Sequence, residues 1–131
     1  MGHKSICILG LGPTWIECPY DKTVWGINAV YQKAKRVDML WNLHKWGLSD
    51  PIMHPDVLKK LNIPIMAVEP WEGLNTIIYP LDAILRRFKT TFFADSVSYM
   101  IAYAIYKEYK EIDLYGIDHI FGNEYTDIKP C

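Results

Sequence analysis

A glycine-rich turn ends the first apolar run of the chain and could bind a phosphate group. The apolar residues 6–9 lead into the turn Gly10, Leu11, Gly12, Pro13 and Thr14. Glycines let the backbone approach an anion closely, so the N–H groups of the turn, with the Thr14 hydroxyl, could hold phosphate or ribose oxygens. The alternative is a tight turn between a strand and a loop that binds no ligand, because a short glycine motif is weak evidence.

The turn departs from the dinucleotide-binding fingerprint in two ways. Ile16 and Glu17 stand where the Gly-x-Gly-x-x-Gly pattern would be completed. No acidic residue follows the second predicted strand at the place where NAD-binding proteins hold the ribose. The sequence therefore disfavours a dinucleotide.

A second candidate anion site is the start of a predicted helix at Asp95 and Ser96. The backbone N–H groups and the dipole of a helix start attract a phosphate, and the Ser96 hydroxyl can donate a hydrogen bond to it. The Asp95 carboxylate would repel a phosphate unless it faces away or binds a sugar hydroxyl. Simple capping of the helix is the alternative interpretation of this segment.

Polar residues also follow two predicted strands, at Asn28 and at Asn42 and His44. A carboxamide offers a donor and an acceptor together, so Asn28 could bind a base edge or a ribose, or it could cap the next helix. We expect Asn42 and His44 to point into the same crevice. His44 is either an acid–base group or a structural histidine.

Asp118 follows the last predicted strand, where it could bind ribose hydroxyls, a metal ion or the backbone of the next turn. His119, Glu124 and Asp127 come soon after it. Their spacing matches no ligand motif, so we expect no metal site. If the protein is a transferase, His44, Asp118 and His119 are the candidate acid–base groups.

These residues are positioned by alternating strands and helices, which is typical of an α/β fold. The patterns predict strands at residues 5–9, 23–28, 36–42, 63–68, 75–79 and 112–116, and helices at residues 29–35, 51–61, 81–88 and 96–109. Asp50 is the predicted N-cap of the helix at 51–61, with Pro51 at its first position. We expect one Rossmann-like, three-layer domain over residues 1–131, with a mostly parallel sheet and an irregular, cropped-looking tail at 121–131.

The composition of the chain restricts the kinds of partner that the protein is expected to bind. The chain has 131 residues and a net charge of -1, which argues against a dedicated surface for nucleic acid or for an anionic membrane. Nine Tyr and five Trp are too many to bury fully in one small core, so we expect a groove or a homo-oligomer interface. Three Cys without metal-type spacing, and no signal peptide, predict a cytoplasmic protein.

The segment from Ser96 to Asp118, together with the glycine turn and Asn28, resembles a known family. It is similar to the helix–strand unit of bacterial family 42 sialyltransferases and of the related DUF115 (MptE-like) Rossmann-like proteins. Their loop reads like "GNGPS", which the turn beginning at Gly10 resembles, and an asparagine follows their second strand as Asn28 does here. The chain looks closest to short phage-encoded members of unassigned role.

The resemblance implies a nucleotide, cytidine or another, held by the glycine turn, Asn28, Ser96 and the loop after Asp118, with Tyr125 at the position of a phosphate-binding tyrosine. Leu11 replaces the asparagine of the family's loop, and Glu108 stands where relatives often carry the glycine that ends the helix. The transferase's catalytic histidine belongs to a region beyond residue 131. The resemblance therefore implies nucleotide binding more than sialyl transfer.

We therefore expect the protein to bind a nucleotide or nucleotide-sugar at the carboxyl edge of its sheet, without a further cofactor. Three interpretations stay open. The protein could be a nucleotide-sugar-dependent transferase or a nucleotide-processing enzyme. It could instead be a non-enzymatic sponge that sequesters a host immune signalling nucleotide. The third possibility is a scaffold piece that binds no ligand.

Overall fold

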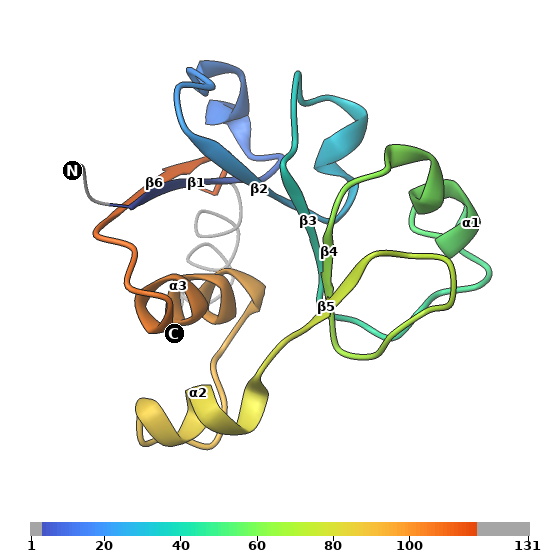
Figure 1. Cartoon of the computed structure of the whole chain (residues 1–131). Coiled ribbons are helices and arrows are strands. Elements are labelled where there is room, and N and C mark those ends of the chain that lie inside the picture. The colour runs from blue at the N-terminus through green and yellow to red at the C-terminus, as the bar shows by residue number, and fades with distance from the viewer. Residues whose placement is uncertain (1–3, 118–131) are drawn as a thin grey trace, which may run out of the picture.

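The computed structural model describes residues 4–117 and consists of one six-stranded sheet with helices on both faces (Figure 1). All five strand pairings are parallel, in the order β5-β4-β3-β2-β1-β6. The strands are β1 Ser5–Leu9, β2 Thr23–Ile27, β3 Met39–Asn42, β4 Ile65–Ala67, β5 Thr76–Ile78 and β6 Glu111–Tyr115. The α-helices are α1 Pro55–Leu58, α2 Leu81–Arg87 and α3 Ser96–Tyr106, and the 3-10 helices are η1 Pro13–Glu17, η2 Asn28–Gln32 and η3 Lys59–Leu61. The expected Rossmann-like, three-layer α/β fold is confirmed.

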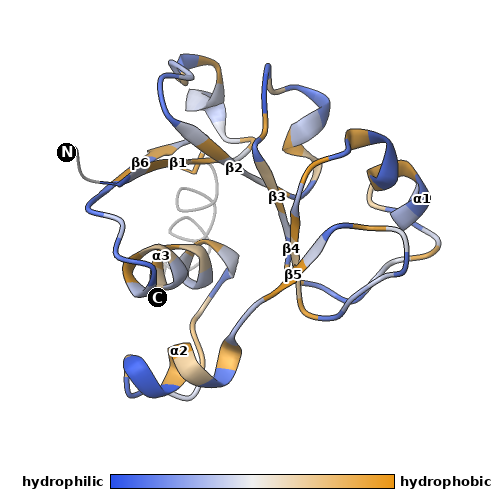
Figure 2. Ribbon diagram, viewed as in Figure 1, coloured by the Kyte–Doolittle hydropathy of each residue, from blue (hydrophilic) through white to orange (hydrophobic). Residues whose placement is uncertain are grey.

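The two faces of the sheet are covered by different helices, because strand side chains alternate between faces. In β1, Ile6 and Ile8 pack in a core with α2 and α3, whereas Cys7 and Leu9 pack in a second core with η1 and η2. A third cluster joins β3 and β4 to Leu58 of α1. Figure 2 shows that apolar residues are concentrated along the strands.

The core beneath α3 is rich in aromatic rings. The rings of Trp25 and Trp41, on neighbouring strands, are 5.2 Å apart between their centroids. Tyr103 of α3 lies 5.7 Å from Trp25 and 5.4 Å from Trp41. Burial of such large rings stabilises the packing of α3 on the sheet. The core thus contains part of the large number of aromatic residues in the chain.

The prediction of a helix at residues 51–61 is wrong about where the helix begins. The Asp50 carboxylate accepts hydrogen bonds from the N–H groups of Ile52 (2.8 Å) and Met53 (3.2 Å), which closes a turn instead of beginning a helix. The helix α1 begins four residues later at Pro55, and the ring nitrogen Nδ1 of His54 caps it by accepting from the N–H of Asp56 (3.0 Å). The helix expected at residues 29–35 is the shorter 3-10 helix η2.

The helix expected at residues 96–109 ends earlier, at Tyr106. Glu108 adopts the left-handed conformation, with φ of 67°. The N–H of Glu108 donates to the carbonyl of Ile105 and the N–H of Tyr109 to that of Ala104, both at 2.9 Å. This is a Schellman C-cap, with a glutamate at the position that glycine usually occupies.

Candidate functional site

The order of the strands directs attention to the carboxyl edge of the sheet. From β1 the sheet extends through β2 to β5 on one side and to β6 on the other. Connections that leave the edge in opposite directions open a crevice there, and ligands of parallel α/β proteins bind at such a point. The glycine turn follows β1, Asn28 follows β2, and His44 lies two residues after β3.

The glycine turn is packed tightly against the end of β6. The N–H of Gly12 donates to the carbonyl of Gly116 (2.6 Å), and the N–H of Gly116 donates to the Thr14 hydroxyl (2.9 Å). A Cβ atom at Gly116 would lie 2.0 Å from the carbonyl oxygen of Gly10. These contacts account for glycine at positions 10 and 116 within the fold itself. Phosphate binding by this turn stays a prediction.

The next two strand ends form a hollow of about 360 Å³, which we call the strand-end hollow. Its walls come from the ends of β2 and β3 and from the loop that follows β3. The lining residues are Asn28, Ala29, Asn42, His44, Lys45, Gly47, Asp50, Ile52 and Met53. Three of the polar residues singled out in the sequence, Asn28, Asn42 and His44, are thus brought together.

Asn42 is the buried polar residue of this hollow, with only 4% of its surface exposed. Its side chain shares a face of the sheet with Leu40, because Trp41 between them points into the opposite core. The Asn42 carboxamide oxygen accepts from the N–H of His44 at 3.3 Å. Within residues 4–117 its amide nitrogen makes no hydrogen bond. Among the described residues, the fully buried side-chain donor without a partner is Trp41 Nε1, so the Asn42 amide nitrogen is in contact with solvent and can donate to a ligand acceptor.

Asn28 enters the hollow through an uncommon backbone conformation. Its φ is 48°, in the left-handed region, which asparagine tolerates better than most residues. The N-cap of η2 is Ile27, and no side chain caps this helix. The alternative that Asn28 caps the following helix is therefore wrong, and Asn28 is one of the residues that line the hollow.

The outer wall of the hollow is a braced loop. The Tyr31 hydroxyl donates to the carbonyl of Ile52, while the Asp50 carboxylate holds the turn before it. Burial raises the pKa of the Tyr31 phenol, and the nearby Asp50 adds to the rise. Tyr31 thus stays a neutral donor at physiological pH. His44 and Lys45 are exposed at the rim, where their nitrogens can meet an anionic ligand.

The start of α3 lies outside the lining of this hollow. Asp95 is its N-cap, as one interpretation of the segment predicted, and its carboxylate accepts from the N–H of Ser98 at 2.8 Å. Anion binding by Asp95 and Ser96 stays a prediction.

Asp118, His119 and Tyr125 lie outside the described residues.

Sequence reasoning missed the loop wall of the hollow. Lys45, Gly47 and Met53 carry no recognisable motif, and Asp50 was expected to cap a helix. The Asp50 turn was the available signal, because aspartate often binds backbone N–H groups two and three residues ahead.

The described residues hold no group of three His, Cys, Asp or Glu side chains that could bind a metal ion. No helix in the same part of the chain is long and apolar enough to span a membrane. The expectations of a homo-oligomer and of a cytoplasmic location stay predictions.

The chain matches no known family model, no curated protein and no solved structure.

Proposed function

We propose that this protein binds a nucleotide or nucleotide-sugar in the strand-end hollow. The observation that carries the proposal is the buried Asn42 carboxamide, whose amide nitrogen makes no hydrogen bond within the described chain. It lies in a hollow at the carboxyl edge of a parallel sheet, the edge at which ligands bind in this class of fold, beside the point between β1 and β6 where the strand order reverses.

The chemistry of the lining supports a sugar phosphate. The two carboxamides, Asn28 and Asn42, offer both donors and acceptors, which suits vicinal ribose hydroxyls. Lys45 and His44 at the rim supply nitrogen donors for a phosphate. Asp50 is the acidic member of the lining, and its carboxylate already accepts two backbone hydrogen bonds.

Isothermal titration calorimetry with UMP, AMP and UDP-glucose tests this proposal. We expect Asn42→Leu to weaken the binding of whichever ligand binds best by roughly 10- to 100-fold, because the ligand loses a hydrogen-bond donor worth about 1–3 kcal/mol. Asn75→Leu is the matched control, since that asparagine is exposed and outside the hollow. Equal affinities in the two variants, or no binding of any nucleotide to the unmodified protein, would contradict the proposal.

Whether the ligand is consumed separates an enzyme from a sponge. His44 is the described acid–base candidate at the rim, and transfer would require its ring within hydrogen-bond reach of the reacting oxygen. If the protein is an enzyme, we expect product to form, and we expect His44→Ala to lower the rate of product formation more than it lowers ligand affinity. The sponge predicts that the bound nucleotide is recovered intact.

A further inference from the structure

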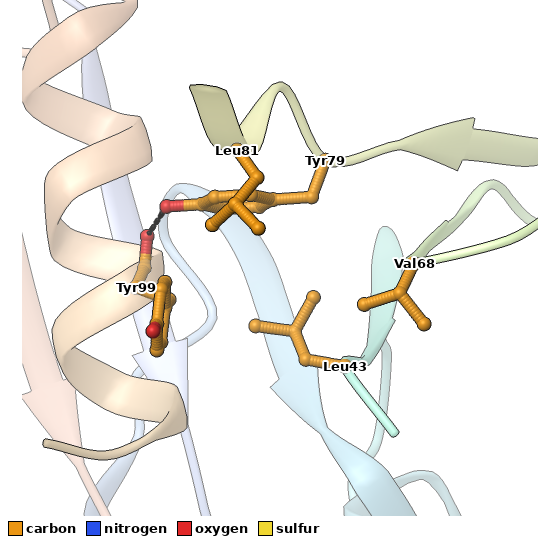
Figure 3. Close-up of a pocket in the computed structure, with 5 residues that line it drawn as sticks. All are labelled: Leu43, Val68, Tyr79, Leu81 and Tyr99. Carbon is orange, nitrogen blue, oxygen red and sulfur yellow. Dashed lines mark hydrogen bonds between the residues drawn. The ribbon is translucent and has the colours of Figure 1, made fainter. Parts of the chain in front are cut away.

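A second pocket, of about 250 Å³, lies where the ends of β3, β4 and β5 meet α3 (Figure 3). It is lined by Leu43, Val68, Tyr79, Leu81 and Tyr99. Leu43, Val68 and Tyr79 each follow directly after a strand, β3, β4 and β5 respectively. Tyr99 comes from the first turns of α3. We call it the apolar pocket.

The hydroxyl groups of the apolar pocket are already engaged inside the protein. The Tyr79 hydroxyl donates to the carbonyl of Tyr99 at 2.6 Å, and the Tyr99 hydroxyl accepts from the N–H of Phe93 at 3.1 Å. Burial raises the pKa of the Tyr79 phenol, so it remains neutral. The pocket therefore presents mainly aromatic rings and methyl groups to a ligand, and the O–H of Tyr99, which only accepts in the bond to Phe93, is its remaining donor.

The apolar pocket and the strand-end hollow meet at one stretch of chain. Leu43 lines the pocket, and its neighbours on either side, Asn42 and His44, line the hollow. Consecutive Cα atoms are about 3.8 Å apart, so both sites lie at the tip of β3. A ligand that passes over the tip of β3, with a polar part on one side and a flat apolar part on the other, would contact both.

Resting on the proposed function, we infer that the apolar pocket receives the base of the nucleotide whose sugar and phosphate occupy the strand-end hollow. Ring stacking and methyl contacts hold the base there. Such contacts tolerate any base, because every base has a π-face. We therefore expect the affinities for UMP and AMP to differ by less than about 10-fold, and ribose 5-phosphate, which lacks a base, to bind about 10- to 100-fold more weakly than UMP.

Filling the apolar pocket tests the inference. Val68 and Leu81 are 45% and 44% exposed at its rim, so a larger side chain there can enter the pocket without disturbing the buried core. In Val68→Trp we expect the affinity for UMP to fall to that for ribose 5-phosphate, while the affinity for ribose 5-phosphate itself is unchanged. The matched control is Ile16→Trp, because Ile16 is 73% exposed and belongs to η1.

Methyl NMR on the unmodified protein gives a second measurement that needs no variant. We expect UMP, and not ribose 5-phosphate, to shift the methyl signals of Leu43, Val68 and Leu81 and to show contacts from base protons to them. Full UMP affinity in Val68→Trp together with unshifted methyls overturns the inference. The same holds if phenol shifts these methyls and UMP does not, since the pocket then takes an unrelated apolar ligand.

Different experimental results would contradict this inference and the proposed function. If Asn42→Leu weakens UMP binding while Val68→Trp leaves it intact, the hollow binds the nucleotide and the base lies elsewhere. If UMP does not bind the unmodified protein at all, the proposed function and the base pocket fail together.

Discussion

At the scale of single residues, two left-handed positions show how side-chain chemistry follows backbone conformation. Asn28, at φ of 48°, follows directly after β2 and lines the strand-end hollow. Glu108 at φ of 67° ends α3. Asparagine is among the residues that tolerate the left-handed region, whereas glutamate is disfavoured there by steric contact of its Cβ with the backbone. The first position therefore carries a candidate binding group, and the second carries strain.

The strain at Glu108 predicts that Glu108→Gly stabilises the protein. Glycine adopts the left-handed conformation without steric cost, and we expect the free energy of unfolding to rise by about 0.5–1 kcal/mol. Urea denaturation measures the change. Lys107→Gly is the control, because Lys107 has φ of -88° and glycine should destabilise the helix end there. Equal effects of the two substitutions would contradict the interpretation of the C-cap.

At the scale of elements, the position of Asn28 depends on how closely η2 packs on β2. A Cβ atom at Gly26 would lie 2.7 Å from the Val30 side chain and 2.9 Å from that of Val37. Only a residue without a side chain allows this approach. Gly26 thus lets η2 fold back on the strand and hold Asn28 at the edge of the sheet.

This packing predicts that Gly26→Ala destabilises the protein by about 1–3 kcal/mol, because the added methyl overpacks a buried contact. We also expect weaker nucleotide binding, since η2 must move. Gly47→Ala is the control for stability alone, because its Cβ would meet the nearest atom, Cβ of Asp50, at an ordinary 3.5 Å, although Gly47 itself lines the hollow. Thermal and urea unfolding of both variants measure the difference. An undiminished stability in Gly26→Ala would show that β2 and η2 separate without cost.

At the scale of the whole molecule, buried ionisable groups make stability depend on pH. Burial raises the pKa of the Cys7 thiol from 9.0 to about 12, with a smaller contribution from the neighbouring Cys18. Burial also raises the pKa of Tyr79 above its ordinary value of 10.0. In both cases the unfolded chain loses its proton at a lower pH than the folded protein does.

The stability contributed by Cys7 is therefore fully present below pH 9 and is lost as the pH rises toward 12. One such group lowers the free energy of unfolding by up to about 1.4 kcal/mol per pH unit in this interval. Urea denaturation at a series of pH values should show a shallower decline in Cys7→Val than in the unmodified protein. Parallel declines would mean that the Cys7 thiol ionises as readily in the folded state as in the unfolded chain.

The fold was predictable because short apolar runs bounded by turn residues alternate with helix-like periods along the chain. Residues 5–9 form the predicted strand with both bounds correct, and Asp95 caps α3, as the alternative interpretation of that segment predicted. Element ends were less predictable where a side chain binds the local backbone. Asp50 illustrates this, because its carboxylate can either cap a helix or close a turn, and the local sequence permits both.

The sequence by itself determined the class of the fold and the polar residues at the strand ends, since these depend on local pattern. Only the tertiary structure decided which of them meet. It placed Asn28, Asn42 and His44 around one hollow, and it set Gly10 against Gly116 from the far end of the described chain. The physical reason is strand order. Parallel pairing brings β6 beside β1 and β3 beside β2, and no local pattern states which strands are neighbours.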